Sequence, residues 1–285
     1  MARTKAISLL QATSTKADLS EIYGIVIDNV MKDTLSNVLK SQAYTGNPEA
    51  GSVEFKRFTN SEAKNYGTAR TVGKGDSITA PSVTVNLDTH REIVEECAKF
   101  DLDTFGVSGI MSRRAMNHID TMSTDLDTAF FSTACTSATE FTPATVDALD
   151  ILEEAILKLE TVKNKHVRGT NRINHRLILS PSYYSTVRNK LDSVINSNVD
   201  TASEEFGMFH GVKVYSSINL PDGVDFLIMH AGAVAQPVVV NQYSEPEKIP
   251  LSNDFAVSLF YDYGTTALNP DLMFVKKVKT EVTGG

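Results

Sequence analysis

The stretch at residues 46–87 reads GNPEAGSVEFKRFTNSEAKNYGTARTVGKGDSITAPSVTVNL, and its pattern decides how the fold is interpreted. Two segments within it predict β-strands: VEFKRF at 53–58, and SVTVNL at 82–87, where apolar and polar residues alternate. The residues between them are polar and carry glycines at 67, 73 and 75, which favour a turn. A two-stranded hairpin of this length does not stabilise itself in water. We therefore expect an extended arm that packs on a neighbouring subunit.

The apolar side chains of the two arm strands are the residues that we expect at this interface. They are Val53, Phe55 and Phe58 on the first strand, and Val83, Val85 and Leu87 on the returning strand. An arm that adds strands or side chains to a neighbour provides contact area without enlarging the core of its own subunit.

Composition places the chain among ordinary water-soluble proteins. It has 285 residues, 41% of them hydrophobic and 22% charged, enough for one large domain or two modest ones. No apolar run approaches the roughly 20 residues of a membrane span, and no secretion signal is evident at the start. We therefore expect no membrane association and a cytoplasmic site of synthesis. The two cysteines, Cys97 and Cys135, are expected to be free thiols.

The formal net charge of −8 argues against a nucleic-acid-binding protein, because binding phosphate backbones needs clustered Lys and Arg. The same charge fits a surface that lies close to packed nucleic acid without adhering to it. The densest basic stretch, KNKHVRGTNRINHR at 163–176, has no interleaved aromatic residues and is interpreted as a solvated loop.

Motifs of catalysis and metal binding are missing from the sequence. The six histidines do not pair with Cys, Glu or each other at metal-ligand spacing, and there is no P-loop and no GxSxG elbow. The Gly-Lys-Gly of TVGKGD at 71–76 follows no buried strand, and the paired carboxylates are typical of solvated helix faces. We predict no catalytic residue, no cofactor and no metal, and hence no enzyme.

Helical and strand periodicities divide the rest of the chain. Apolar steps of three and four predict one helix over 19–44, begun by the pair Asp18 and Glu21, and a long narrow-striped helix over 112–133. Further on, a helix around 149–159 precedes the strand RLILS at 176–180, which runs into a helix at Pro181. Strands follow at 212–215, 225–229, 255–263 and 272–279.

In this order the elements resemble the major capsid protein of tailed bacteriophages, the Hong Kong ninety-seven-type fold. The resemblance rests on the arm, the long helix, the segment RLILSPSYYSTVRNKL at 176–191, and the closing block FAVSLFYDYGTTALNPDLMFVKK at 255–277. It implies an α+β fold with an N-terminal arm and helix (1–45) and an extended two-stranded loop (46–90). It further implies a peripheral domain with a spine helix (91–143), an axial domain with a mixed sheet flanked by helices (144–238), and two strands returning to the peripheral domain (239–285).

The function that the resemblance implies is structural. Copies of the chain would self-assemble as hexamers and pentamers into an icosahedral virion shell around double-stranded DNA, held by proximity and without sequence specificity. Assembly would occur in the host cytoplasm. A separate scaffolding protein and a portal are the expected partners, since Met1 lies close to the first helix and leaves no room for a built-in scaffolding segment. Lysine-to-asparagine cross-linking is not carried over, because no acceptor is identified.

Two alternatives remain open at this point. An encapsulin-like nanocompartment shell has the same fold, although residues 1–45 argue against it because such shells usually begin with a helix. An enzyme of unrecognised family is the alternative from another class. Particle mass separates the two classes, because an ordinary enzyme does not form a megadalton particle.

Overall fold

The computed structural model describes residues 26, 28–43, 48–97, 107–192, 207–241, 247–248 and 254–278. Contacts divide the chain into two compact units. Unit 1 comprises Met1–Val38, Asn86–Asp127 and Pro237–Gly264; unit 2 comprises Leu39–Val85, Thr128–Gln236 and Thr265–Gly285. Both units are thus assembled from segments that are far apart in the sequence.

Unit 1 is built on a four-stranded sheet centred on β12. Strands β3, β10 and β11 each pair antiparallel with β12. The strands are β3 (Thr89–Cys97), β10 (Val238–Asn241), β11 (Glu247–Lys248) and β12 (Phe255–Tyr263). β3 and β12 pair antiparallel along their whole lengths, from Thr89 opposite Tyr263 to Cys97 opposite Phe255. The sequence left residues 91–102 ambiguous; the structure makes them strand as far as Cys97, and residues 98–106 lie outside the described part.

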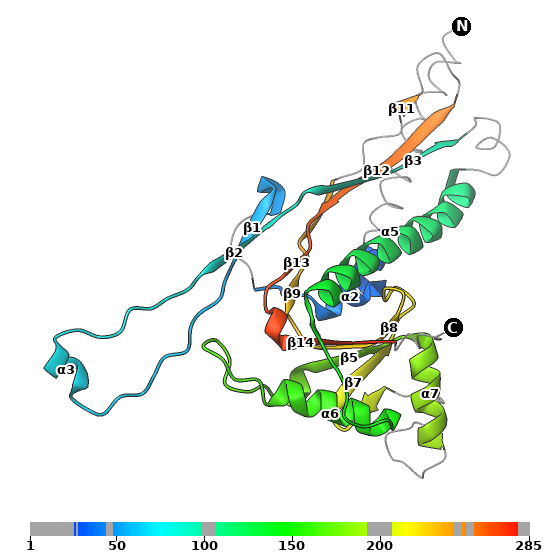
Figure 1. Cartoon of the computed structure of the whole chain (residues 1–285). Helices are drawn as coiled ribbons and strands as arrows, with labels where there is room; N and C mark the ends of the chain where they lie inside the picture. The colour runs from blue at the N-terminus through cyan, green and yellow to red at the C-terminus, as the bar shows by residue number, and fades with distance from the viewer. Residues whose placement is uncertain are drawn as a thin grey trace, which may run out of the picture. The chain divides into compact units, whose positions relative to one another are not determined.

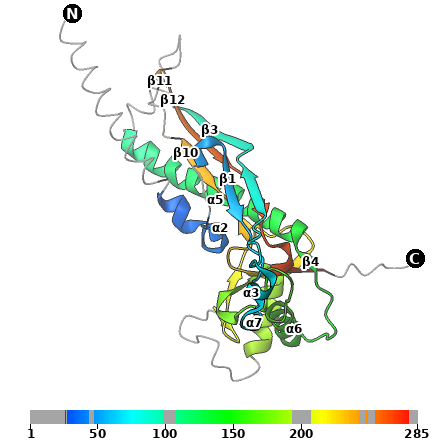
Figure 2. The ribbon, with the colours of Figure 1, turned by 90° about the vertical axis from the view of Figure 1, so that its left-hand side faces the viewer.

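Helix α5 (Val107–Ser137) is the long helix that the sequence predicts, extended at both ends beyond 112–133. Its first part lies along one face of the β3–β12 sheet (Figure 2). Asp125 of α5 accepts hydrogen bonds from the hydroxyls of Tyr261 (2.9 Å) and Tyr263 (3.2 Å). The same carboxylate forms an ion pair with Arg91 of β3 at 3.3 Å. Burial raises the pKa of the Tyr261 hydroxyl above its usual range, and its hydrogen bond to the Asp125 carboxylate raises that pKa further. The helix is therefore joined to β12 and β3 by polar contacts.

A second polar contact lies nearer the start of α5. Glu95 of β3 pairs with Arg114 and lies 3.0 Å from the Nε2 atom of His118, both on α5. The hydrogen bond from Arg114 is the main cause of a lowered pKa for Glu95. Ile119, Met122 and other apolar residues of α5 are buried, as its predicted narrow stripe requires.

Gly264 follows β12 at a point where two backbones touch. A Cβ atom at this position would lie 1.8 Å from the backbone oxygen of Asn86, so no larger residue fits without moving the chain. The close approach fixes the end of β12 against the end of the second arm strand.

The helix predicted over 19–44 is only partly correct. Residues before 26, including the Asp18 and Glu21 pair, lie outside the described part. Residues 28–33 are helical, the helix breaks at Thr34, and α2 (Leu35–Leu39) follows and ends five residues before the predicted end. The break has a definite cause: the amides of Leu35 and Ser36 donate to the carboxylate of Asp127 instead of to helix carbonyls.

Unit 2 contains a mixed six-stranded sheet in the order β4-β14-β8-β5-β7-β6. The strands are β4 (Thr139–Glu140), β5 (His175–Leu179), β6 (Met208–Phe209), β7 (Val212–Ser216), β8 (Val224–His230) and β14 (Met273–Lys277). β5 pairs with β7, and β14 with β4, in parallel; the remaining pairs are antiparallel. The short elements η2 (Arg172–Asn174) and η3 (Pro270–Leu272) precede β5 and β14.

The placement of β14 corrects the expectation that the last two long strands share a domain. β12 belongs to the unit 1 sheet, whereas β14 pairs with β8 in the unit 2 sheet, with Met273, Phe274 and Val275 buried there. Local pattern predicts each strand correctly but contains no information about which sheet receives it.

Two helices pack on this sheet: α6 (Ala148–Glu160) and α7 (Pro181–Asp192). The predicted strand-to-helix junction is present, because Ser180 Oγ accepts a hydrogen bond from the amide of Tyr183 and Pro181 is the first helical residue. Cys135 is a free buried thiol, as expected, and burial raises its pKa to about 12.

Candidate functional site: an extended arm and its supporting loop

The arm is present as the sequence predicts, and it projects from the rest of unit 2 (Figure 1). After η1 (Pro48–Ala50), strand β1 (Ser52–Lys56) pairs with β2 (Ser82–Asn86). Two further backbone bonds, from Arg57 N to Pro81 O and from Thr59 N to Thr79 O (both 3.0 Å), extend the pairing outward. We call β1 and β2 the root of the arm, and residues 57–81 its tip.

The root is buried by the chain itself. Val53 and Phe55 of β1 and Val85 of β2 form one apolar cluster with Ala235 and Leu268, and Val83 packs partly against it. Ala235 belongs to β9 (Val234–Ala235), and Leu268 follows β13 (Thr266–Ala267), which pairs with β9.

Three of the six residues expected at an interface, Val53, Phe55 and Val85, belong to this cluster; Val83 packs partly against it, and Leu87 is also buried. Val53, Phe55, Val85 and Leu87 are between 0% and 7% exposed, so residues of the same chain already cover the surfaces that were assigned to a neighbour. The alternating pattern correctly identified an apolar face, but the partner of that face is internal. Phe58, which is 59% exposed, remains a candidate contact for another subunit.

A loop of unit 2 supports the arm just beyond its root. This supporting loop, residues 161–170, folds back on itself through a bridge between Lys163 and Arg168. The amide of Asn60 donates to the carbonyl of Lys165 (2.8 Å), and Arg168 donates to the carbonyl of Ser61. The Nδ1 atom of His166 lies 3.1 Å from the carbonyl of Phe58, where it acts as the donor. The basic stretch that the sequence suggested to be a solvated loop thus contacts the arm backbone.

One ion pair fixes the arm where the root meets the tip. The Arg57 guanidinium lies 2.7 Å from both carboxylate oxygens of Asp271, which belongs to η3, and Asn164 of the supporting loop donates to the same carboxylate. Burial acts to raise the pKa of Asp271, but the hydrogen bonds, chiefly from Arg57, leave that pKa below its usual value. No local sequence signal identifies this triad, because its three members lie in three distant segments.

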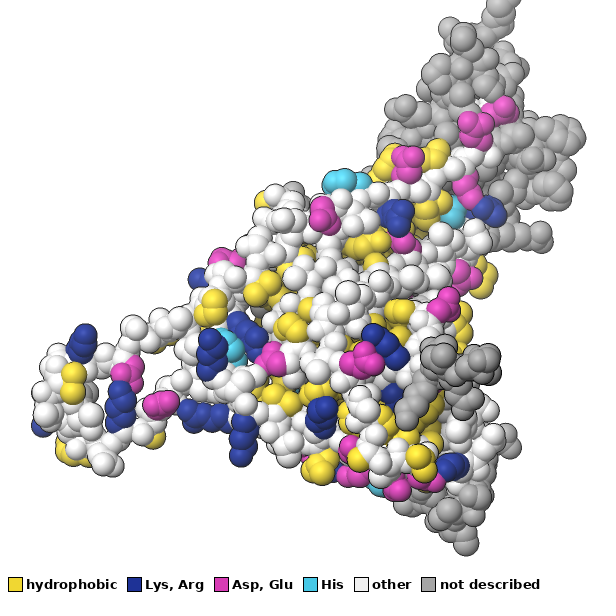
Figure 3. Space-filling model, in the orientation of Figure 1, with side chains coloured by type: hydrophobic (Ala, Val, Ile, Leu, Met, Phe, Trp, Pro, Cys, Tyr) yellow, Lys and Arg dark blue, Asp and Glu magenta, His cyan; other side chains and the backbone are white. Residues whose placement is uncertain are grey.

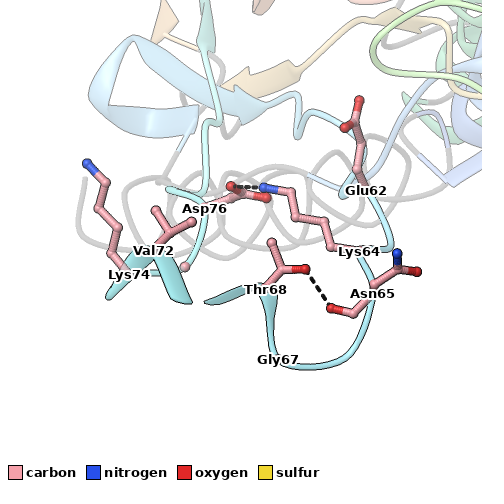
Figure 4. A pocket seen from close by; sticks show the side chains of 9 residues that line it. Glu62, Lys64, Asn65, Gly67, Thr68, Val72, Lys74 and Asp76 are labelled. Carbon is pink, nitrogen blue, oxygen red and sulfur yellow. Dashed lines mark hydrogen bonds and ion pairs between the residues drawn. The ribbon is translucent and has the colours of Figure 1, made fainter. Parts of the chain in front are cut away.

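The tip is polar, charged and open to solvent. It contains the short helix α3 (Thr68–Val72), which begins and ends at left-handed glycines, Gly67 and Gly73. Lys64 pairs with Asp76 at 2.6 Å across the loop and Thr68 donates to the carbonyl of Asn65 at 2.7 Å, leaving a hollow of about 280 Å³ (Figure 4).

The tip also carries exposed apolar side chains, of which Val72 lines the hollow. Tyr66, Val72 and Ile78 are 97%, 64% and 88% exposed. The tip also carries four basic and two acidic residues, so it is positive in a chain of net charge −8, and both kinds of side chain are visible at the far end of the arm (Figure 3). Apolar surface without cover and charge opposite to that of the whole chain are the features of a contact surface for another molecule.

Within the residues that the structure describes, no group of three or more His, Cys, Asp or Glu side chains could hold a metal ion. None of the helices in the described ranges is long and apolar enough to cross a membrane.

Comparisons with known proteins identify the fold. No protein-family profile matches the chain, and no curated protein sequence matches it. Solved structures do match: a chain from Mycobacterium phage Che8 has a TM-score of 0.59 at 19% identity, covering 81% of this chain and 85% of that one. The capsid structure of Cyanophage P-SCSP1u matches with a TM-score of 0.63 at 14% identity. The match covers 86% of this chain and 88% of that one. The virus-like particle from Pyrococcus furiosus matches with a TM-score of 0.56 at 14% identity. That match covers 93% of this chain and 98% of the other.

These likenesses extend over most of the chain and of each matched structure. The chain therefore has the Hong Kong ninety-seven-type capsid fold, with the α+β architecture that the resemblance implied.

Proposed function

We propose that this chain is a structural shell protein, without enzymatic activity, that self-assembles as hexamers and pentamers into an icosahedral virion shell around double-stranded DNA. The observation that carries the proposal is an arm tip with exposed apolar side chains that no described part of its own chain covers, on a chain with a capsid fold. A shell needs large repeated interfaces between identical subunits, and such a tip supplies part of one.

The surface that best fits the tip lies on unit 1 of a neighbouring copy. On the face of the β3–β12 sheet that turns away from Glu95 and Arg91, Val94 is 51% exposed and Phe260 is 38% exposed. The exposed acids Glu92 and Glu96 flank them on β3. Apolar residues with an acidic margin complement a tip that is apolar and basic.

A nanocompartment shell is the second candidate. The likeness to the virus-like particle from Pyrococcus furiosus, which covers 98% of that chain, supports it. The two candidates differ in cargo, since a virion shell encloses DNA whereas a nanocompartment encloses other contents.

A separate scaffolding protein and a portal are further proposed partners, and host cytoplasm is the proposed site of assembly. Identical subunits joined by heterologous contacts can form tubes or sheets when the contacts do not close. A partner that selects curvature during assembly resolves this ambiguity.

The test is to express the chain, measure particle mass by light scattering and image the products. Closed shells of megadalton mass are expected, irregular when the chain is alone and uniform when a scaffolding partner is supplied. Nuclease-protected DNA in particles from infected cells distinguishes a virion from a nanocompartment. A chain that stays a monomer or small oligomer under all these conditions would refute the proposal.

A further inference from the structure

The helical segment that precedes the arm is interrupted in an unusual way. The Thr34 amide still donates to the Val30 carbonyl at 3.0 Å, as in a regular helix. The next two amides leave the helix series and donate to one carboxylate: Leu35 N to Asp127 Oδ2 at 3.1 Å, and Ser36 N to Asp127 Oδ1 at 2.8 Å.

The carboxylate comes from a distant part of the chain and is buried. Asp127 lies on α5, 91 residues after Ser36, and is 6% exposed. Thr34 and Ser36 are each 2% exposed, so the break lies in the interior and is not a frayed helix end.

A second side chain completes the broken form. In a continuous helix the Met31 carbonyl would accept from the amide of Leu35. Here the side-chain amide of Asn37 donates to that carbonyl at 2.8 Å instead. The Leu35 amide and the Met31 carbonyl, which a continuous helix would join, therefore each have a side-chain partner instead.

The apolar spacing of the local sequence is that of a continuous helix. Residues 28–39, DNVMKDTLSNVL, contain neither glycine nor proline, and their apolar steps continue across Thr34. Sharp breaks in helices have identifiable causes, and a side chain inserted into the hydrogen-bond series is one of them. Apolar spacing and tertiary contact therefore favour different forms of the segment, and these forms differ by a few hydrogen bonds.

We propose that Asp127 is a latch that holds residues 28–39 in the broken form. With the latch open, Leu35 and Ser36 bond to the preceding turn, the helix becomes continuous, and the part before Thr34 changes direction relative to α5. The inference is independent of the proposed shell function, because it concerns contacts within unit 1 of one chain.

Spin-label distances test the latch directly. Labels are placed on Lys32→Cys and Thr124→Cys, two exposed positions of unit 1, after both native cysteines are replaced by alanine. The labelled chain is diluted with an excess of unlabelled chain to remove distances between subunits. The latched protein should give one narrow distance distribution.

Asp127→Asn should add a second distance, with its population rising on the order of tenfold, as loss of a hydrogen bond to a charged acceptor implies. Adding Leu35→Pro should restore the single distance, because proline is tolerated at a first helical position but not within a continuous helix. Asp120→Asn, which removes an exposed charge from the same helix, is the matched control and should change nothing.

An unchanged distribution in Asp127→Asn, or the same shift in Asp120→Asn, would overturn the latch. Should Asp127→Asn fail to fold, Asn37→Ala carries the test, because it weakens the broken form and leaves the buried Asp127 carboxylate unchanged. It should shift the distances in the same direction, and an unchanged distribution there would equally refute the proposal.

Discussion

At the root of the arm, Val53, Phe55 and Val85 are at most 5% exposed, whereas at its tip Tyr66 and Ile78 are 97% and 88% exposed. Root and tip belong to one hairpin and both carry apolar residues, yet among the residues that the structure describes only the root has a cover from its own chain. The comparison shows that an arm can be fixed firmly at one end and remain available for contact at the other. The root determines stability, and the tip is the part that we expect to determine assembly.

The largest expected effect is at the root. Phe55→Ala should lower the free energy of unfolding by about 3–5 kcal/mol, because it leaves a cavity in the cluster with Ala235 and Leu268. Denaturant unfolding of the unassembled chain measures it. Phe58→Ala is the matched control and should change stability by less than about 0.5 kcal/mol, since that ring is exposed. Equal losses in both variants would remove the distinction between root and tip.

A smaller loss is expected at the boundary. Arg57→Met should cost about 1–2 kcal/mol, because Asp271 is half-buried and loses its charged partner, while solvent reduces the effect. The same change at Arg70, an exposed residue of the tip, should cost little. If the Arg57 and Arg70 variants were equally stable, the ion pair between Arg57 and Asp271 would not stabilise the arm.

The boundary ion pair also predicts a pH dependence. The pKa of Asp271 is lower in the folded chain than its ordinary value of 3.8, so its contribution is fully present above that value. The contribution is lost as the pH falls through the lower folded-state pKa. The stability difference between wild type and Asp271→Asn, followed by thermal unfolding from neutral pH to about pH 2, should therefore shrink below about pH 4. A difference that grows on acidification would contradict this sign.

The smallest effect is expected within the tip. The Lys64–Asp76 pair is exposed, so Lys64→Met should change the free energy of unfolding by less than about 0.5 kcal/mol. Asp76→Asn should behave in the same way, by the same unfolding measurement. A loss comparable to that of Arg57→Met would mean that the tip stabilises its own chain.

Much of this architecture could be predicted from local pattern. Alternation identified both arm strands, steps of three and four identified α5, and Ser180 with Pro181 identified the junction between β5 and α7. These signals are local because they depend on residues within one or two turns or a few strand positions.

The partners of these elements could not be predicted in the same way. The cover of Phe55 comes from residues 180 to 213 positions further along the chain, and the break at Thr34 depends on Asp127. β14 has an ordinary strand pattern, but its sheet is decided by pairing with β8. Contacts of this kind leave no periodic trace in the sequence, so pattern specifies which face is apolar and not what covers it.

The most direct test of the proposed role of the tip is an electron cryomicroscopy map of the assembled particle. Phe58, Tyr66 and Ile78 at the tip should be covered by unit 1 of an adjacent subunit, beside Val94 and Phe260, while Val53 and Phe55 keep their internal partners. A tip that lies free in solvent, or that is covered only by its own subunit, would contradict the central claim.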